Sequence, residues 1–88
     1  MSDLDASMAA AADARGVMRD RLVQLSRAAT AAVGRGTPQL GTDLPAEFDR
    51  VVLAARHLID AVSTYRAADD GYRARRAQAT IQRHNQKG

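Results

Sequence analysis

Two stretches of the chain place apolar residues at alternating intervals of four and three positions, the spacing of a helix that buries one stripe. The first stretch comprises Leu4, Met8, Ala11, Arg15, Met18, Leu22, Leu25, Ala29 and Ala32, with one charged interruption. The second comprises Phe48, Val51, Ala55, Leu58, Val62, Tyr65, Asp69, Tyr72 and Arg76, and is interrupted by an aspartate. The pattern predicts helices over about residues 3–33 and 46–73.

The intervening residues 34–45 read GRGTPQLGTDLP and contain three glycines and two prolines. Both residue types end helices and form turns. A connection of this length allows the two helices to fold back on each other. We therefore predict an all-α fold, an antiparallel two-helix hairpin formed by residues 1–73. Residues 74–88 are expected to form a basic tail that is partly helical or disordered.

Each stripe has a charged interruption, and the antiparallel arrangement brings the two together. Arg15 of the first stripe would lie opposite Tyr65 or Asp69 of the second. A partly buried charge requires a partner. We therefore expect Arg15 to pair with Asp69 or to hydrogen-bond the Tyr65 hydroxyl.

The apolar composition predicts a thin core. Alanine supplies 19 of the 88 residues, and Leu, Ile, Val, Met and Phe together supply another 19. Alanine favours helices but buries little surface. A small hairpin of this composition is expected to need a second chain, so we predict dimerisation into a four-helix bundle. Val23, Val52 and Ile59 are the candidate dimer face.

The formal net charge of +3 is unevenly distributed. Residues 73–88 contain no acid, and their cations are Arg73, Arg75, Arg76, Arg83 and Lys87. Such a tail could contact nucleic-acid phosphates, but it lacks interleaved aromatics for base stacking, so nucleic acid is the less favoured partner. A structural protein that self-assembles through its apolar stripes is a further alternative.

Catalytic and metal-binding patterns are absent from the sequence. The chain has no cysteine, and its two histidines, His57 and His84, lack the i, i+3 or i+4 spacing of helical metal ligands. It has no glycine-rich phosphate-binding motif, and a two-helix hairpin offers no deep pocket. We expect no enzymatic activity, no cofactor and no metal. The sequence also lacks an apolar run suited to a membrane span or a signal peptide.

Residues 65–69, Tyr-Arg-Ala-Ala-Asp, fit the pattern Y-x-x-x-[D/E] near the end of the second predicted helix. With the spaced apolar residues before it and Tyr72 after it, this segment resembles substrates of the type VII (ESX) secretion system. The likeness is to the EspC-like branch of the WXG superfamily and covers roughly residues 4–73. The Trp-x-Gly turn of that superfamily is missing, and GRGTPQLG stands in its place, so the resemblance is to a divergent member of the superfamily.

The resemblance implies a small hairpin that is exported as a folded homodimer or heterodimer. The partner would be another small helical protein or the N-terminal helical region of a larger exported protein, which some relatives escort. Tyr65 and Asp69 would form the export signal, read by machinery whose motor is a membrane-bound ATPase. The protein would be cytoplasmic before export, and secreted or at the cell surface after it, by a route independent of a signal peptide. Residues four apart share one side of a helix, so the aromatic ring and the carboxylate can form one patch.

Overall fold

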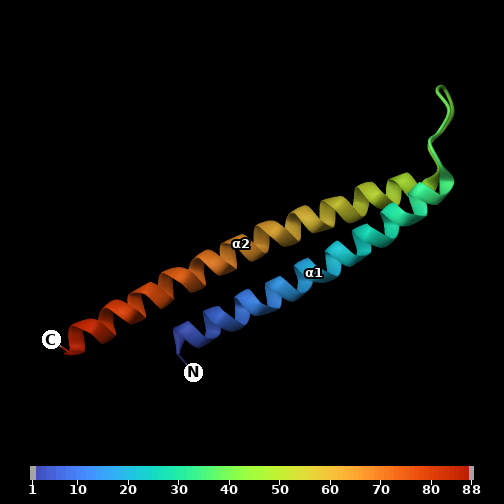
Figure 1. Ribbon diagram of the computed structural model, residues 1–88. Coiled ribbons are helices and arrows are strands. Elements are labelled where there is room, and N and C mark those ends of the chain that lie inside the picture. The colour runs from blue at the N-terminus through green and yellow to red at the C-terminus, as the bar shows by residue number, and fades with distance from the viewer. Residues whose placement is uncertain (1, 88) are drawn as a thin grey trace.

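The computed structural model describes residues 2–87, and their side chains as far as His84. It contains two α-helices, α1 (Asp3–Arg35) and α2 (Ala46–Lys87). The helices run antiparallel, pack along their length and curve gently together (Figure 1). The predicted all-α hairpin is therefore confirmed. The hairpin is a rod that measures 72 × 20 × 13 Å.

Local chemistry sets the ends of α1. Ser2 caps its N-terminus, because the Ser2 hydroxyl oxygen accepts a hydrogen bond of 3.1 Å from the Asp5 amide. Asp3 and Asp5 place negative charge in the first turn, where the helix dipole favours it. Gly36 ends the helix with a φ of 78°, a conformation that disfavours a β-carbon, and its amide donates to the Val33 carbonyl at 3.0 Å.

A loop of residues 36–45 joins the helices and projects from one end of the rod (Figure 1). It contains a tight turn in which the Thr42 amide and hydroxyl both donate to the Gln39 carbonyl, at 3.2 and 2.6 Å. At its far side the Phe48 amide donates to the Pro45 carbonyl at 3.0 Å, which starts α2. We call this end of the rod the loop end and the opposite end the open end.

The second helix continues to Lys87, well past the expected end near residue 73. The alanines and arginines that follow Gly71 are strong helix formers, so they prolong the helix although their apolar pattern fades. The last turns of α2 extend beyond the start of α1 (Figure 1). The expected basic tail is therefore a continuation of α2 rather than a separate segment.

Two ion pairs between the helices lie near the two ends of the rod. Arg35 Nε lies 3.1 Å from Glu47 Oε1 beside the loop, and Arg75 Nη1 lies 3.7 Å from Asp3 Oδ2 near the open end. The arginines of both pairs are more than half exposed, so each pair contributes little to stability. Together they are consistent with the antiparallel register of the helices.

Alanines form the buried seam between the helices. Among the described residues, the most buried are Ala11, Ala14, Ala32, Ala54 and Ala61, which are 7–9% exposed. In α1, Leu4, Ser7, Ala11, Ala14, Met18, Arg21, Leu25, Ala28 and Ala32 are buried or half-buried at alternating steps of three and four, and Ala29 is half-buried beside them; in α2, Val51, Ala54, Leu58, Ala61, Tyr65, Ala68 and Tyr72 follow the same spacing. These sets keep a strict seven-residue repeat, which indicates coiled-coil packing.

This seam differs from the predicted one at every second position. Met8 and Leu22 were expected to face α2, but they are 50% and 55% exposed, and Ala14 occupies the interior beside the predicted Arg15. In α2, Ala54 and Ala61 are more buried than the predicted Ala55 and Val62. Small side chains let two helix axes approach closely, so alanines are the most buried residues of the seam, and larger seam residues such as Met18 and Leu58 are half-buried.

Candidate functional site

The shifted seam leaves one side of the hairpin with most of the large apolar side chains. Two recesses identify this side: one is lined by residues that include Met8, Ala12, Arg15, Tyr65, Asp69 and Tyr72, and the other by residues that include Val33 and Phe48. The seven-residue repeat places further residues on it. From α1 these are Asp5, Met8, Ala12, Arg15, Arg19, Leu22, Ser26, Ala29 and Val33, and from α2 Phe48, Val52, Ala55, Ile59, Val62, Tyr65, Arg66, Asp69, Tyr72, Arg73, Arg76 and Arg83. We call this side the tyrosine face.

The proposed export signal lies within the recess near the open end of this face. Tyr65 and Asp69 are one helical turn apart on α2, and both side chains line the recess together with Tyr72. All three are half-buried. Arg15 reaches the same recess from α1, as the two interrupted stripes indicated. The recess therefore brings together the charged and aromatic residues that sequence analysis singled out in both helices.

The structure gives Asp69 a different partner from the expected Arg15. Asp69 Oδ2 lies 2.9 Å from Arg73 Nε, four residues further along α2. A partner within the same helix is reached without closing the gap between the helices, and this i, i+4 spacing suits an ion pair. Arg15 is exposed, so solvent can satisfy its guanidinium. The Asp69 side chain is 20% exposed and remains at the edge of the recess.

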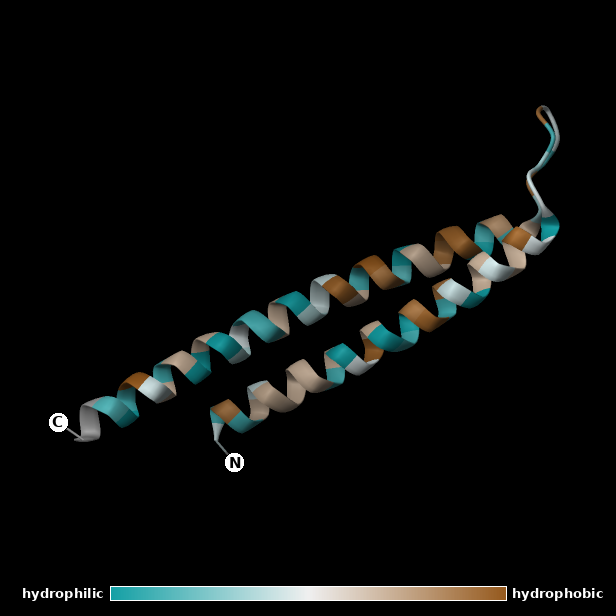
Figure 2. Ribbon diagram, viewed as in Figure 1, coloured by the Kyte–Doolittle hydropathy of each residue, from teal (hydrophilic) through white to brown (hydrophobic). Residues whose placement is uncertain are grey.

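The loop-end half of the tyrosine face is apolar. Val52 is 50% exposed, Ile59 is 66% exposed, and Leu22 of α1 joins them. Figure 2 shows the hydrophobic segments gathered in this half of the hairpin, while the C-terminal half of α2 is mostly hydrophilic. Val52 and Ile59 thus share one surface, as the predicted dimer face requires. Val23, its third member, is 42% exposed but lies on the side of α1 turned away from α2.

The open-end half of the tyrosine face is basic along α2, while α1 contributes Met8, which is 50% exposed. Arg73 of the expected tail continues the row of Val52 and Ile59, and Arg76 and Arg83 lie beside that row, three and ten residues further along α2. Arg66, which sequence analysis did not single out, belongs to the same row seven residues after Ile59. Arg75 lies off this row and pairs with Asp3. The side chain of Lys87 lies outside the described part of the structure.

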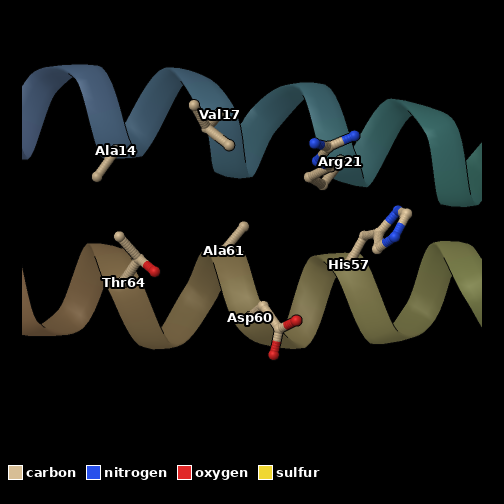
Figure 3. A pocket seen from close by; sticks show the side chains of 7 residues that line it. All are labelled: Ala14, Val17, Arg21, His57, Asp60, Ala61 and Thr64. Atoms are coloured by element: carbon tan, nitrogen blue, oxygen red, sulfur yellow. The ribbon is translucent and has the colours of Figure 1, made fainter.

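The opposite side of the hairpin carries a shallow recess with polar lining residues, which include Arg21, His57, Asp60 and Thr64 (Figure 3). Ala61 points toward α1 in the middle of this region, and the His57 ring extends toward α1 (Figure 3). Arg21 instead folds along its own helix, where Nη1 donates to Gln24 Oε1 at 3.0 Å. We call this side the histidine face.

Two further classes of site were sought in the part of the chain that the structure describes. No group of three or more histidine, aspartate or glutamate side chains there is arranged to hold a metal ion. Within residues 2–87, neither helix contains a segment apolar enough to cross a lipid bilayer.

Comparison of the chain with protein-family models, curated proteins and solved structures gives no match. The functional argument therefore depends on the residues themselves and on the geometry of the tyrosine face.

Proposed function

We propose that this protein is a small helical substrate of a type VII (ESX) secretion system, or the escort partner of a larger exported protein. It acts by forming a four-helix bundle with a second helical chain and by presenting Tyr65 and Asp69 as an export signal. The observation that carries the proposal is the shared recess of Tyr65 and Asp69 on an outer face of the hairpin.

Two features support the dimerisation part of the proposal. The most buried of the described residues are alanines, which contribute little hydrophobic stabilisation compared with larger side chains. The larger apolar residues Leu22, Val52 and Ile59 are at least half exposed in the single hairpin. A second pair of helices packed on this surface would remove them from water, as in other four-helix bundles.

The position of the signal supports the recognition part. Tyr65 contributes a half-buried ring whose surroundings are set by both helices, and Asp69 holds its carboxylate at the rim of the same recess. The Arg73 ion pair restricts the Asp69 rotamer. A receptor would meet an aromatic ring and a carboxylate in a fixed relation, because a folded helix positions both.

Export from a cell that carries a type VII system tests the proposal. Tyr65→Ala and Asp69→Ala are each expected to abolish export while the helical circular dichroism spectrum and the mass of any dimer stay unchanged. Asp70→Ala is the matched control, because Asp70 is exposed, adjacent to Asp69 and outside the recess. Export of both signal variants at the wild-type level would show that the sorting role is wrong.

A further inference from the structure

The tyrosine face changes chemical character along its length. Its loop-end half presents Leu22, Val52 and Ile59, and its open-end half presents Arg66, Arg76 and Arg83. Arg66 continues the row of Val52 and Ile59, and Arg76 and Arg83 lie on the adjacent row of the same side of α2. An occupant that follows α2 along this face must therefore be apolar at one end and anionic at the other.

The tyrosine face itself carries few carboxylates that could neutralise its arginines. Its described cations there are Arg15, Arg19, Arg66, Arg73, Arg76 and Arg83, whereas its acids there are Asp5 and Asp69. Asp69 is already paired with Arg73. Other acids, Asp13, Asp20 and Asp60 among them, fall by the helical repeat on the histidine face, which Asp60 lines.

A second copy of the chain is a poor occupant for this reason. A two-fold dimer brings the same surface of both subunits together, so that surface must be complementary to itself. With the loop ends aligned, Arg66, Arg76 and Arg83 would face their own equivalents. With the copies reversed, the guanidinium groups would cover the apolar half. Neither arrangement gives the cations carboxylates of their own.

Nucleic acid fits the face no better. Phosphates could neutralise the arginines of the open-end half, but a phosphate backbone offers nothing to Val52 and Ile59, which are the most exposed side chains of that row in the loop-end half. An amphipathic helix pair can supply both an apolar segment and an acidic segment. A protein partner therefore satisfies both halves at once.

The exposed area is large enough for such a partner. The hairpin exposes 7104 Å², whereas a compact monomer of 9.4 kDa is expected to expose about 5,000 Å². A stable interface buries about 800 Å² on each partner. The surplus surface of the rod therefore exceeds what one interface requires.

We infer that the tyrosine face binds a different helical chain, one that is apolar opposite Val52 and Ile59 and carries carboxylates opposite Arg66, Arg76 and Arg83. The inference rests on the dimerisation part of the proposed function and specifies the chemistry of the partner. Tyr65 and Asp69 lie on the same face, beside these positions, but the test below measures association and not export, so the failure of either idea can be recognised separately.

A charge-reversed version of the same chain can serve as the probe partner. The variant Arg66→Glu/Arg76→Glu/Arg83→Glu keeps the apolar half and the Asp69–Arg73 ion pair but makes the open-end half acidic. Mixed with the wild type, it is expected to form a 1:1 complex of twice 9.4 kDa, measured by size-exclusion chromatography with light scattering. The mixed complex is expected to be at least tenfold tighter than wild-type self-association, about what three contacts that change from repulsion to attraction would give.

The matched control reverses three arginines elsewhere on the rod. Arg27→Glu/Arg50→Glu/Arg56→Glu changes the net charge equally but leaves the tyrosine face intact, since the helical repeat places these residues off that face. It is expected not to bind the wild type more tightly than the wild type binds itself. Raising the salt concentration should weaken the mixed complex, because exposed charges are screened. Circular dichroism confirms that each variant remains helical.

Four outcomes would overturn the inference. The first is a folded charge-reversed variant that forms no mixed complex. The second is wild-type self-association as tight as the mixture, which would make a second copy the occupant. The third is equal pairing by the control variant, which would reduce the effect to net charge. The fourth is displacement of the variant from the wild type by a short DNA duplex at physiological ionic strength, which would favour nucleic acid.

Discussion

Ile59 provides the sharpest test of whether the apolar half of the tyrosine face is an interface. Its side chain is 66% exposed, while its neighbour Leu58 is half-buried against α1. The two residues are adjacent in sequence and equal in size. Replacing each by alanine therefore separates a contribution to association from a contribution to the hairpin itself.

In the isolated hairpin, Ile59→Ala is expected to change stability little. About a third of the side chain is buried, which is worth roughly 0.5–1 kcal/mol, and the higher helix propensity of alanine returns roughly 0.4 kcal/mol. In a complex that covers the side chain fully, the remaining two thirds of its burial is worth roughly 1–2 kcal/mol. The dissociation constant should then rise by a factor of roughly 5–30.

The assay has two parts. Urea unfolding of dilute protein, followed by circular dichroism at 222 nm, reports the stability of the hairpin. Titration of wild type or Ile59→Ala with the charge-reversed variant reports association. Leu58→Ala is expected to lower the unfolding free energy by roughly 1–2 kcal/mol, because it removes part of the contact with α1.

The reasoning fails if Ile59→Ala leaves the dissociation constant unchanged, because the side chain would then stay exposed in the complex. It also fails if Ile59→Ala destabilises the dilute hairpin as much as Leu58→Ala does, because Ile59 would then already be buried within one chain.

Two further predictions concern the hairpin alone. Gly36→Ala is expected to lower the unfolding free energy by roughly 1–2 kcal/mol, because Gly36 has a positive φ of 78°. Gly16→Ala, at an exposed helical position with open space around it, should raise the unfolding free energy by roughly 0.5–1 kcal/mol. Urea unfolding in which both variants shift in the same direction would contradict this. The Glu47 pKa is lowered from its usual 4.5 by its own backbone hydrogen bond at the helix start and by the Arg35 side chain. A lowered carboxyl pKa contributes stability that is present above pH 4.5 and is lost as the pH falls through the folded-state pKa. The thermal unfolding midpoints of wild type and Glu47→Gln should therefore converge in acid and diverge toward neutral pH. A difference between the midpoints that does not change with pH would exclude this role.

The hairpin itself was accessible from sequence because three independent signals agreed. The four-three spacing and the abundance of alanine indicate two helices, and the glycines and prolines of residues 34–45 indicate a turn that lets them fold back. The helix C-terminus was less accessible. Fading apolar periodicity around Gly71 suggested an end, but helix propensity alone carries α2 to Lys87.

The seam was displaced because the prediction followed the largest apolar residues. The predicted stripe included Met8 and Leu22 because they are large and apolar, whereas Ala14 and Ala61 are the buried residues between the helices. The sequence does contain a signal for the observed seam. Small residues recur at seven-residue intervals at Ser7, Ala14 and Ala28, and Arg21 is the one large residue in that series. Size and spacing must be considered together when a core is built mainly from alanine.

The sequence predicted which residues meet at the candidate site, but it predicted only part of the contacts between them. Helical spacing fixed Tyr65 and Asp69 on one side of α2, and the antiparallel register brought Arg15 to them. The choice of ion-pair partner depends on side-chain rotamers, and Arg73 is closer along the helix than Arg15 is across the gap. Sequence periodicity does not encode that competition.

The position of the loop has a practical consequence for handling the protein. Residue 2 and residue 87 both lie toward the open end of the rod, so a tag fused near either would crowd the arginines there (Figure 1). Leu40, at the turn that Gln39 and Thr42 close, is fully exposed. A short affinity epitope or a fluorophore placed there would lie at the loop end of the rod and leave the tyrosine face and the histidine face unobstructed.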